Sequence, residues 1–245
     1  MENTKCLFTF IIGRYDNLKT PFKISDNWDY VCVTDEPIIN YNSIWEIKQV
    51  KDIHIVPNNP KRTAMSVMMQ YYKYLSDRYE TIITIGGQLI IDIKLDKFLS
   101  KYGYNKSLDL MLIKHSMRYC VYQEAQAVIE LKKDSEELVN KQMDRYRKDK
   151  YPSGNKLFSS GIMVINNRSV NTRKFYDTWY NEYKNAESKR DMLSLNYSMW
   201  KYEKTNPSLN IGLLHYQEMK DKKDKFGNRD INLYPHAKKN NQKSF

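Results

Sequence analysis

The chain has 245 residues, of which 41% are hydrophobic and 13% aromatic. This length and composition allow a buried core, which excludes global disorder and favours one large α/β domain over two small ones. The formal net charge of +11 indicates an anionic partner, such as nucleic acid, a phosphorylated small molecule or a membrane surface, unless it only keeps a lysine-rich surface soluble.

Strands are predicted where short apolar or alternating runs end at turn-forming residues. In chain order these runs cover residues 6–12, 28–33, 44–50, 81–85, 89–91, 108–113 and 161–166. Helical spacing of apolar residues predicts helices at 61–75, from about 96, at 117–132, 134–150, 169–183 and 190–202. Strands that alternate with helices favour a mostly parallel sheet covered by helices. After Asn206 and Pro207 the pattern fades into a tail rich in lysine and asparagine.

The compartment is suggested by what the sequence lacks. No apolar run is long enough to cross a bilayer, and the first strand lacks the long core and cleavage site of a signal peptide. The three cysteines, Cys6, Cys32 and Cys120, are odd in number and widely spaced. We interpret them as buried thiols in a reducing compartment rather than as disulfides or metal ligands. The sequence therefore predicts a cytoplasmic protein without an integral membrane segment.

A glycine pair, Gly86 and Gly87, follows the strand at 81–85 and precedes Gln88. Glycine has no Cβ, so such a pair lets the backbone approach a ligand closely. Ligands of open α/β sheets collect at the carboxyl ends of strands. The same pattern is also typical of a strand–turn–strand unit with a bulge, and both interpretations stay open.

Five cations lie at or just beyond the ends of predicted elements: Arg14, Lys61, Arg62, Arg118 and Lys220. The charge on a leaving diphosphate grows in the transition state, and cations at such positions stabilise it. The alternative is a set of solvated surface charges.

Four carboxylates and one histidine are further candidates. Asp16 and Asp35 follow the first two strands, where acidic side chains either bind ribose hydroxyls or bond their own turn. Glu124 lies on an otherwise apolar helix, as a ligand or base for an acceptor hydroxyl or on an exposed face. Asp191 begins a helix, where it caps the helix or is held against a sugar. His215 follows the last helix, and a lone histidine is by default structural.

Several motifs in series resemble a glycosyltransferase-like family of plants and bacteria that includes the plant mucilage-related proteins. The stretches are FIIGRYDNLKTP at 10–21, NWDYVCVTD at 27–35, PKRTA at 60–64, YQEA at 122–125 and KRDMLS at 189–194. Their order is preserved from about residue 7 to about residue 200, so the resemblance covers most of the chain.

The resemblance implies a GT-A-like domain at 1–205, with a Rossmann-type mixed, mostly parallel sheet that binds a nucleotide sugar. The basic segment 206–245 is expected to pack on this domain or to trail from it. The resemblance places the nucleotide near Gly13, Tyr15, Asp16 and Asp35, the diphosphate or ribose near Arg62, and the sugar or acceptor near the catalytic candidates Glu124 and Asp191. The stretch LHYQEMK at 214–220 loosely resembles the segment that closes over the diphosphate in glycogenin-like transferases, which implies donor contacts from His215 and Lys220.

The chain departs from the family at the motif DGN, which is replaced by Gly86, Gly87 and Gln88. The resemblance implies that the Asp of this motif binds the metal and the donor. Gly86 supplies no ligand and Gln88 only a neutral carbonyl, whereas Mg²⁺ and Mn²⁺ prefer carboxylate oxygens and phosphates. We therefore expect these three residues at the donor site, no metal ligand, and donor binding that needs no divalent metal.

The predicted function is transfer of a sugar from a nucleotide sugar to a glycan, lipid-linked or protein acceptor, in polysaccharide biosynthesis. One alternative is a catalytically inactive relative that still binds the nucleotide sugar. The other is a basic nucleic-acid-binding protein, because phosphates attract cations and tyrosine stacks on bases. The 20 tyrosines are spread through predicted core elements rather than forming a basic and aromatic stripe, so nucleic acid is the less favoured partner.

Overall fold

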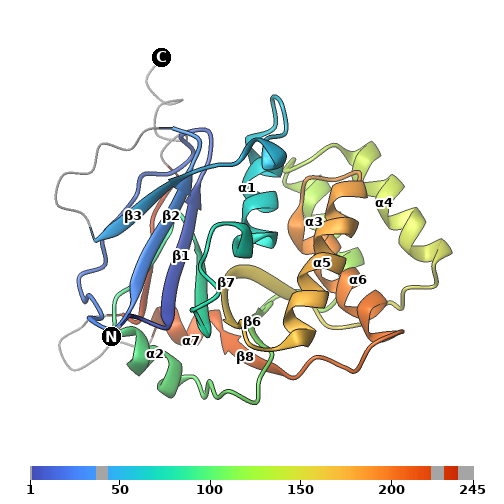
Figure 1. Ribbon diagram of the computed structural model, residues 1–245. Helices are drawn as coiled ribbons and strands as arrows, with labels where there is room; N and C mark the ends of the chain where they lie inside the picture. Colours follow the sequence, from blue (N-terminus) through green and yellow to red (C-terminus); the bar gives the residue numbers. More distant parts are fainter. Residues whose placement is uncertain (1, 37–43, 222–228, 237–245) are drawn as a thin grey trace.

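The computed structural model describes residues 2–36, 44–221 and 229–236, which form a central sheet covered by helices (Figure 1). The main sheet has seven strands in the order β3-β2-β1-β4-β7-β6-β8. Their bounds are β1 Lys5–Ile11, β2 Asp29–Thr34, β3 Trp45–Gln49, β4 Thr81–Gly86, β6 Leu110–Lys114, β7 Phe158–Asn166 and β8 Ile211–His215. Only β7 runs antiparallel to its neighbours β4 and β6. The predicted single α/β domain with a mixed, mostly parallel sheet is confirmed.

Alternating side chains of β1 enter two different cores, as the period of two in a strand requires. Cys6, Phe8 and Phe10 pack with residues of α1 (Pro60–Met69), α5 (Val170–Asn185) and α6 (Asp191–Glu203). Leu7 and Ile11 pack with residues of α2 (Leu95–Lys101) and α7 (Tyr216–Asp221). Burying a side chain of this size contributes about 1.5–3 kcal/mol, so both helical layers hold the sheet in place.

A third core lies farther from the sheet, beside α6 (Figure 1). It joins α6 to α3 (Val121–Glu130) and α4 (Glu136–Lys148). Tyr146 of α4 stacks on Tyr197 of α6 with ring centroids 3.8 Å apart. This packing fixes the start of α6, which carries Asp191.

Local capping explains where α1 and α5 begin. Asn59 accepts a hydrogen bond from the Arg62 amide and precedes Pro60, and Ser169 does the same for the amide of Thr172, as expected of helix N-caps. The first helix ends at Met69, so its predicted extension to Leu75 is wrong. Tyr74 Oη accepts a hydrogen bond from the Lys51 amide, and such tertiary contacts override helix propensity.

The prediction of 161–166 as the last strand is also wrong. β8 pairs parallel with β6, and β9 (Ile231–Leu233) pairs antiparallel with β5 (Leu89–Ile91) in a separate two-stranded sheet. Both late strands are short, and β8 contains Gly212, where a Cβ would lie 2.8 Å from Leu108 Cδ1. The described residues beyond 205 thus include β8, α7 and β9, while 222–228 and 237–245, which hold six of the seven lysines of the predicted basic tail, lie outside the described residues.

The three cysteines are buried and free, as predicted. Burial raises the pKa of the Cys32 thiol to about 12 and raises the pKa of Cys6 further, so both stay protonated at neutral pH. Within the described ranges, no helix has the length and apolarity needed to cross a bilayer.

Candidate functional site

The carboxyl ends of β1, β2, β4, β6 and β8 meet at one edge of the main sheet. This follows from the parallel register, in which Phe10 lies opposite both Val33 and Gly86, and Lys114 lies opposite His215. Because β7 is antiparallel, its beginning lies at the same edge. Most of the predicted donor-site segments therefore follow strands whose carboxyl ends lie at the same edge of the sheet. Ligands of α/β sheets bind at this edge.

Gly13 joins the loop after β1 to the end of β2 and the start of α1. Its amide donates to both carboxylate oxygens of Asp35, at 2.8 and 2.9 Å. The residue has a φ of +65°, and a Cβ there would lie 2.7 Å from Pro60 Cβ. Only glycine avoids both the left-handed strain and this contact, so the loop requires it.

Asp16 lies directly against the glycine pair after β4. A Cβ on Gly87 would come within 3.1 Å of both Cβ and Oδ2 of Asp16, so any larger residue there would have to displace Asp16. Asp16 Oδ1 lies 2.7 Å from His236 Nδ1. The His236 ring is 4.3 Å from the ring of Tyr15. Tyr15, Asp16, Gly87 and His236 thus form one group beside the end of β4.

His236 was missed by the sequence analysis, which selected His215. Its position follows from the β5–β9 pairing, which the Tyr234 amide extends by donating to Gln88 O at 2.9 Å. The only local signal is the short apolar alternation at 231–233 ahead of the histidine. That signal does not reveal which distant segment the strand pairs with.

Asp191 is a buried carboxylate of this edge whose two oxygens both have partners. It begins α6, is only 4% exposed, and its Oδ1 lies 3.1 Å from Lys61 Nζ. Its Oδ2 accepts a hydrogen bond from Ser160 of β7. Burial would raise the pKa of Asp191, but the charges of Lys61 and Arg190 and the Ser160 bond outweigh burial and lower it to about 2.

The low pKa of Asp191 limits what it can do chemically. The group is a carboxylate throughout the neutral range, so it cannot donate a proton there. A base works best when its pKa lies near the operating pH, so Asp191 is also a weak proton acceptor. The arrangement suits a fixed negative charge that accepts hydrogen bonds from hydroxyl groups.

The Arg62 guanidinium donates its hydrogen bonds to backbone carbonyls. Its Nη1 donates to Tyr183 O at 3.1 Å, and its Nη2 donates to Ala186 O and Glu187 O at 2.5 and 2.9 Å. These carbonyls lie at or just beyond the end of α5, where the helix dipole is negative. The guanidinium therefore fastens α1 to α5, and the geometry gives no support to the predicted diphosphate contact.

Glu124 lies in a separate buried cluster at the end of β6. It is 2% exposed and accepts a hydrogen bond from Arg118 Nε at 2.6 Å. His115 Nε2 lies 3.9 Å from the same carboxylate oxygen. Burial and the Arg118 charge lower the pKa of His115 despite Glu124, so His115 is neutral at pH 7. The cluster holds the 115–120 loop, which exposes Met117 and Tyr119 by 71% and 62%.

The structure does not bring His215 and Lys220 into the groups around Asp16 or Asp191. His215 ends β8 and is exposed, and Lys220 lies in the last turn of α7. Within the described chain, no hydrogen bond or ion pair joins either of them to those groups. Their predicted donor contacts stay predictions.

The residues present do not fit a resident divalent cation at the family's position. Gly86 faces open space, with no atom within 4 Å of a Cβ built on it, and it offers no side-chain ligand. Among the residues that the structure describes, no group of three or more His, Cys, Asp and Glu side chains could hold a metal. Asp16 and His236 form only a pair, and they bond each other.

Among the described residues, two cations act directly on Asp191. Lys61 pairs with Asp191 and keeps a side chain that is 38% exposed. Arg190 precedes Asp191 and lowers its pKa through its charge, yet its Nε is buried without a hydrogen-bond partner in the described parts of the chain. Arg14, in contrast, pairs with Glu36. Lys61 and Arg190 are therefore the cations best placed to meet an anion beside Asp191.

Comparison with known proteins identifies a family and a fold. Residues 33–225 match the family described as TOD1/MUCI70, glycosyltransferase-like domain; no curated protein matches the chain. Galactosyltransferase LgtC, solved with donor and acceptor sugar analogues, is 8% identical with a TM-score of 0.51, over 94% of this chain and 86% of that chain. Mouse xyloside xylosyltransferase 1 in its apo form is 10% identical with a TM-score of 0.48, and the match covers 85% of this chain and 84% of that chain. Core-mannan synthase A of Aspergillus fumigatus in its Mn/GDP form is 8% identical, covers 86% and 73%, and has a TM-score of 0.47. The fold shared with LgtC is of the GT-A type, as the sequence resemblance implied.

Proposed function

Because the chain belongs to the TOD1/MUCI70 glycosyltransferase-like family, we propose that it transfers a sugar from a nucleotide-sugar donor to a hydroxyl of a glycan, lipid-linked or protein acceptor, in polysaccharide biosynthesis. The observation that carries this proposal is the convergence, at one sheet edge, of a rigid carboxylate, two cations and two glycine-dependent loops. A nucleotide sugar needs each of these: close backbone for the nucleotide, positive charge for the diphosphate and a hydrogen-bond acceptor for the sugar.

The proposed donor position follows the order of the strands. The nucleoside lies over the Gly13–Asp16 loop, with Asp35 at its side. The diphosphate lies between Gly86–Gln88 and the cations Lys61 and Arg190. The sugar then reaches Asp191, which accepts hydrogen bonds from its hydroxyls and holds it for attack.

We propose that donor binding does not require a divalent metal. Gly86 supplies no carboxylate, and the charge of the leaving diphosphate is met instead by Lys61 and Arg190, which a strongly basic chain can provide. The buried free cysteines support a reducing compartment, and we propose the cytoplasm.

The second candidate is an inactive relative that binds the donor without turning it over. The low pKa of Asp191 favours it, because a carboxylate with so low a pKa is a weak base for an acceptor hydroxyl. The nucleic-acid alternative depends largely on the lysine-rich tail, and six of its seven lysines lie outside the described residues.

The test is release of nucleoside diphosphate from a panel of nucleotide sugars by the purified chain. Asp191→Asn keeps the shape of the side chain and removes its charge, and we expect it to reduce release by at least a hundredfold. Asp144→Asn is the matched control, because Asp144 is exposed on α4 and pairs with Arg147 of the same helix. Saturable nucleotide binding without release from any donor would establish the inactive relative. Wild-type turnover unchanged in Asp191→Asn would overturn the proposed site.

A further inference from the structure

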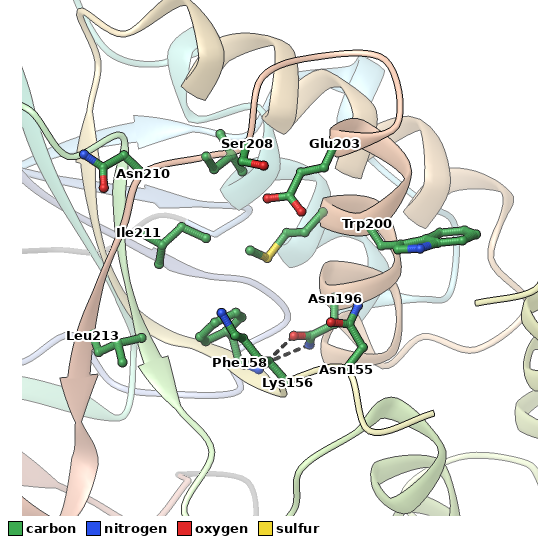
Figure 2. A pocket seen from close by; sticks show the side chains of 12 residues that line it. Asn155, Lys156, Phe158, Asn196, Trp200, Glu203, Ser208, Asn210, Ile211 and Leu213 are labelled. Carbon is green, nitrogen blue, oxygen red and sulfur yellow. Dashed lines mark hydrogen bonds between the residues drawn. The ribbon is translucent and has the colours of Figure 1, made fainter. Parts of the chain in front are cut away.

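A groove lies between α6, the beginning of β7 and the edge strand β8 (Figure 2). Its volume is about 470 Å³, within the roughly 300–1,000 Å³ of sites that bind small molecules. β8 ends the strand order of the main sheet, so the groove opens along an unpaired sheet edge. None of the predicted donor residues lines it.

The groove combines apolar surface with polar groups that include one carboxylate. Phe158 and Met199 are buried and line it together with Leu213, which is 42% exposed. Figure 2 shows the Glu203 carboxylate reaching from α6 into the space, with the Ser208 hydroxyl beside it. Among the described residues, Glu203 has no hydrogen bond or ion pair. Its carboxylate is therefore available to a ligand.

The charge of the groove differs from that of the whole chain. Lys156 and Glu203 are the only charged residues among those that line it, so its formal charges cancel, whereas the chain carries +11. A site for phosphates or nucleic acid would concentrate cations. Neutral polar groups over an apolar floor instead suit a ligand with many hydroxyls and no charge, because hydroxyls both donate and accept hydrogen bonds.

The groove is connected to Asp191 through β7 and α6. Asn196 lines the groove and holds both backbone groups of Phe158, accepting from its amide at 2.8 Å and donating to its carbonyl at 3.2 Å. Ser160, two residues after Phe158, bonds Asp191. On α6 the groove begins five residues after Asp191 and extends to Glu203. At 1.5 Å per residue this spans about 7 to 18 Å from Asp191, which is room for several sugar units.

We propose that this groove binds a neutral oligosaccharide acceptor whose reacting end points toward Asp191. This proposal extends the proposed glycosyltransferase function and rests on it, because an oligosaccharide bound here is an acceptor only if the chain transfers a sugar. The apolar floor packs against the C–H faces of the sugar rings, and Glu203 and Ser208 bond their hydroxyls. The open edge of β8 lets a longer chain leave the groove.

The test uses a panel of neutral di- to tetrasaccharides, such as cellobiose, xylobiose, mannobiose and maltotriose, with sialyllactose as an anionic comparison. Saturation-transfer NMR detects binding to the full chain, and calorimetry gives the affinity. Ser208→Trp fills the groove from an exposed loop, and Glu203→Gln removes one acceptor charge. The matched controls are Ser100→Trp on α2 and Glu137→Gln on α4, both exposed and outside the groove.

We expect at least one neutral saccharide to bind, with affinity reduced at least tenfold by Ser208→Trp and at least threefold by Glu203→Gln. The controls are expected to stay within twofold. The proposal is overturned if no neutral saccharide binds, if sialyllactose binds more tightly than all of them, or if Ser208→Trp changes nothing while circular dichroism shows it folded.

Nucleotide binding, measured in the same samples, separates this proposal from the proposed function. Nucleotide affinity unchanged in Ser208→Trp, together with lost saccharide binding, supports both. A second outcome is that Ser208→Trp abolishes saccharide binding but the wild-type chain binds no nucleotide. The groove then stays a saccharide site, and the glycosyltransferase function is contradicted.

Discussion

At the scale of single residues, Asp191 makes stability depend on pH. Its folded pKa of about 2 lies below its ordinary value of 3.8, so the unfolded chain binds the proton more readily. The contribution to stability is present above about pH 4 and is lost as the pH falls toward 2. A shift of this size corresponds to about 2 kcal/mol.

We therefore expect Asp191→Asn to flatten the dependence of unfolding free energy on pH between about 5 and 2.5. Urea denaturation of the wild type and the variant across this range measures the difference. The other carboxylates titrate in both proteins, so only the difference between the two curves reports on Asp191. Parallel curves would mean that Lys61 and Arg190 do not hold its pKa low.

Gly13 gives a second prediction at this scale, because its backbone strain and its packing can be separated. Gly13→Ala meets both a φ of +65° and Pro60 Cβ at 2.7 Å, whereas Gly154→Ala meets a φ of +75° in open space. Left-handed backbone alone costs an L-residue roughly 1–2 kcal/mol. We expect Gly154→Ala to lower the unfolding free energy by about that amount and Gly13→Ala by clearly more. Equal losses would show that the loop does not depend on the close approach to Pro60.

At the scale of elements, the sequence predicts what is local. The strands near 6–12, 28–33 and 81–85 and the beginnings of α4, α5 and α6 are recognisable because apolar period, glycine and capping residues lie within a few positions. β8 and β9 are not, because their pairing joins Lys114 to His215 and Leu89 to Leu233, more than 100 residues apart. The backbone partners of Arg62 escape the sequence for the same reason, since they are carbonyls of residues 183, 186 and 187.

The β5–β9 sheet leads to a prediction about the two histidines. It places His236 against Asp16 and Tyr15, while His215 lies exposed at the end of β8. His236→Ala is expected to weaken nucleotide binding about fivefold, roughly 1 kcal/mol, because the Asp16 group loses its partner. His215→Ala is the matched control and is expected to leave the affinity within twofold. Calorimetric titration of both variants with nucleotide measures the two affinities. A loss of affinity in His215→Ala but not in His236→Ala would favour the sequence-based choice of His215.

At the scale of the whole molecule, the net charge is a poor guide to the site until each cation is assigned a partner. Arg14 and Arg118 are neutralised by Glu36 and Glu124, and Arg62 by backbone carbonyls. The cations beside Asp191 are Lys61, which forms an ion pair with it, and Arg190. The net charge of +11 therefore matters to the proposed site through these two side chains. We propose that they neutralise the diphosphate in place of a metal.

The most direct measurement is calorimetric titration of the purified chain with a panel of nucleoside diphosphates and their sugars, in excess EDTA and again with Mn²⁺. We expect saturable binding of at least one nucleotide, with less than a tenfold difference, about 1.4 kcal/mol, between the two conditions. Arg190→Gln is expected to weaken that binding at least fivefold, while Arg147→Gln, at an exposed position of α4, leaves it unchanged. No heat from any nucleotide would contradict the account, and a loss of tenfold or more in EDTA would show that a metal, not Arg190 and Lys61, holds the diphosphate.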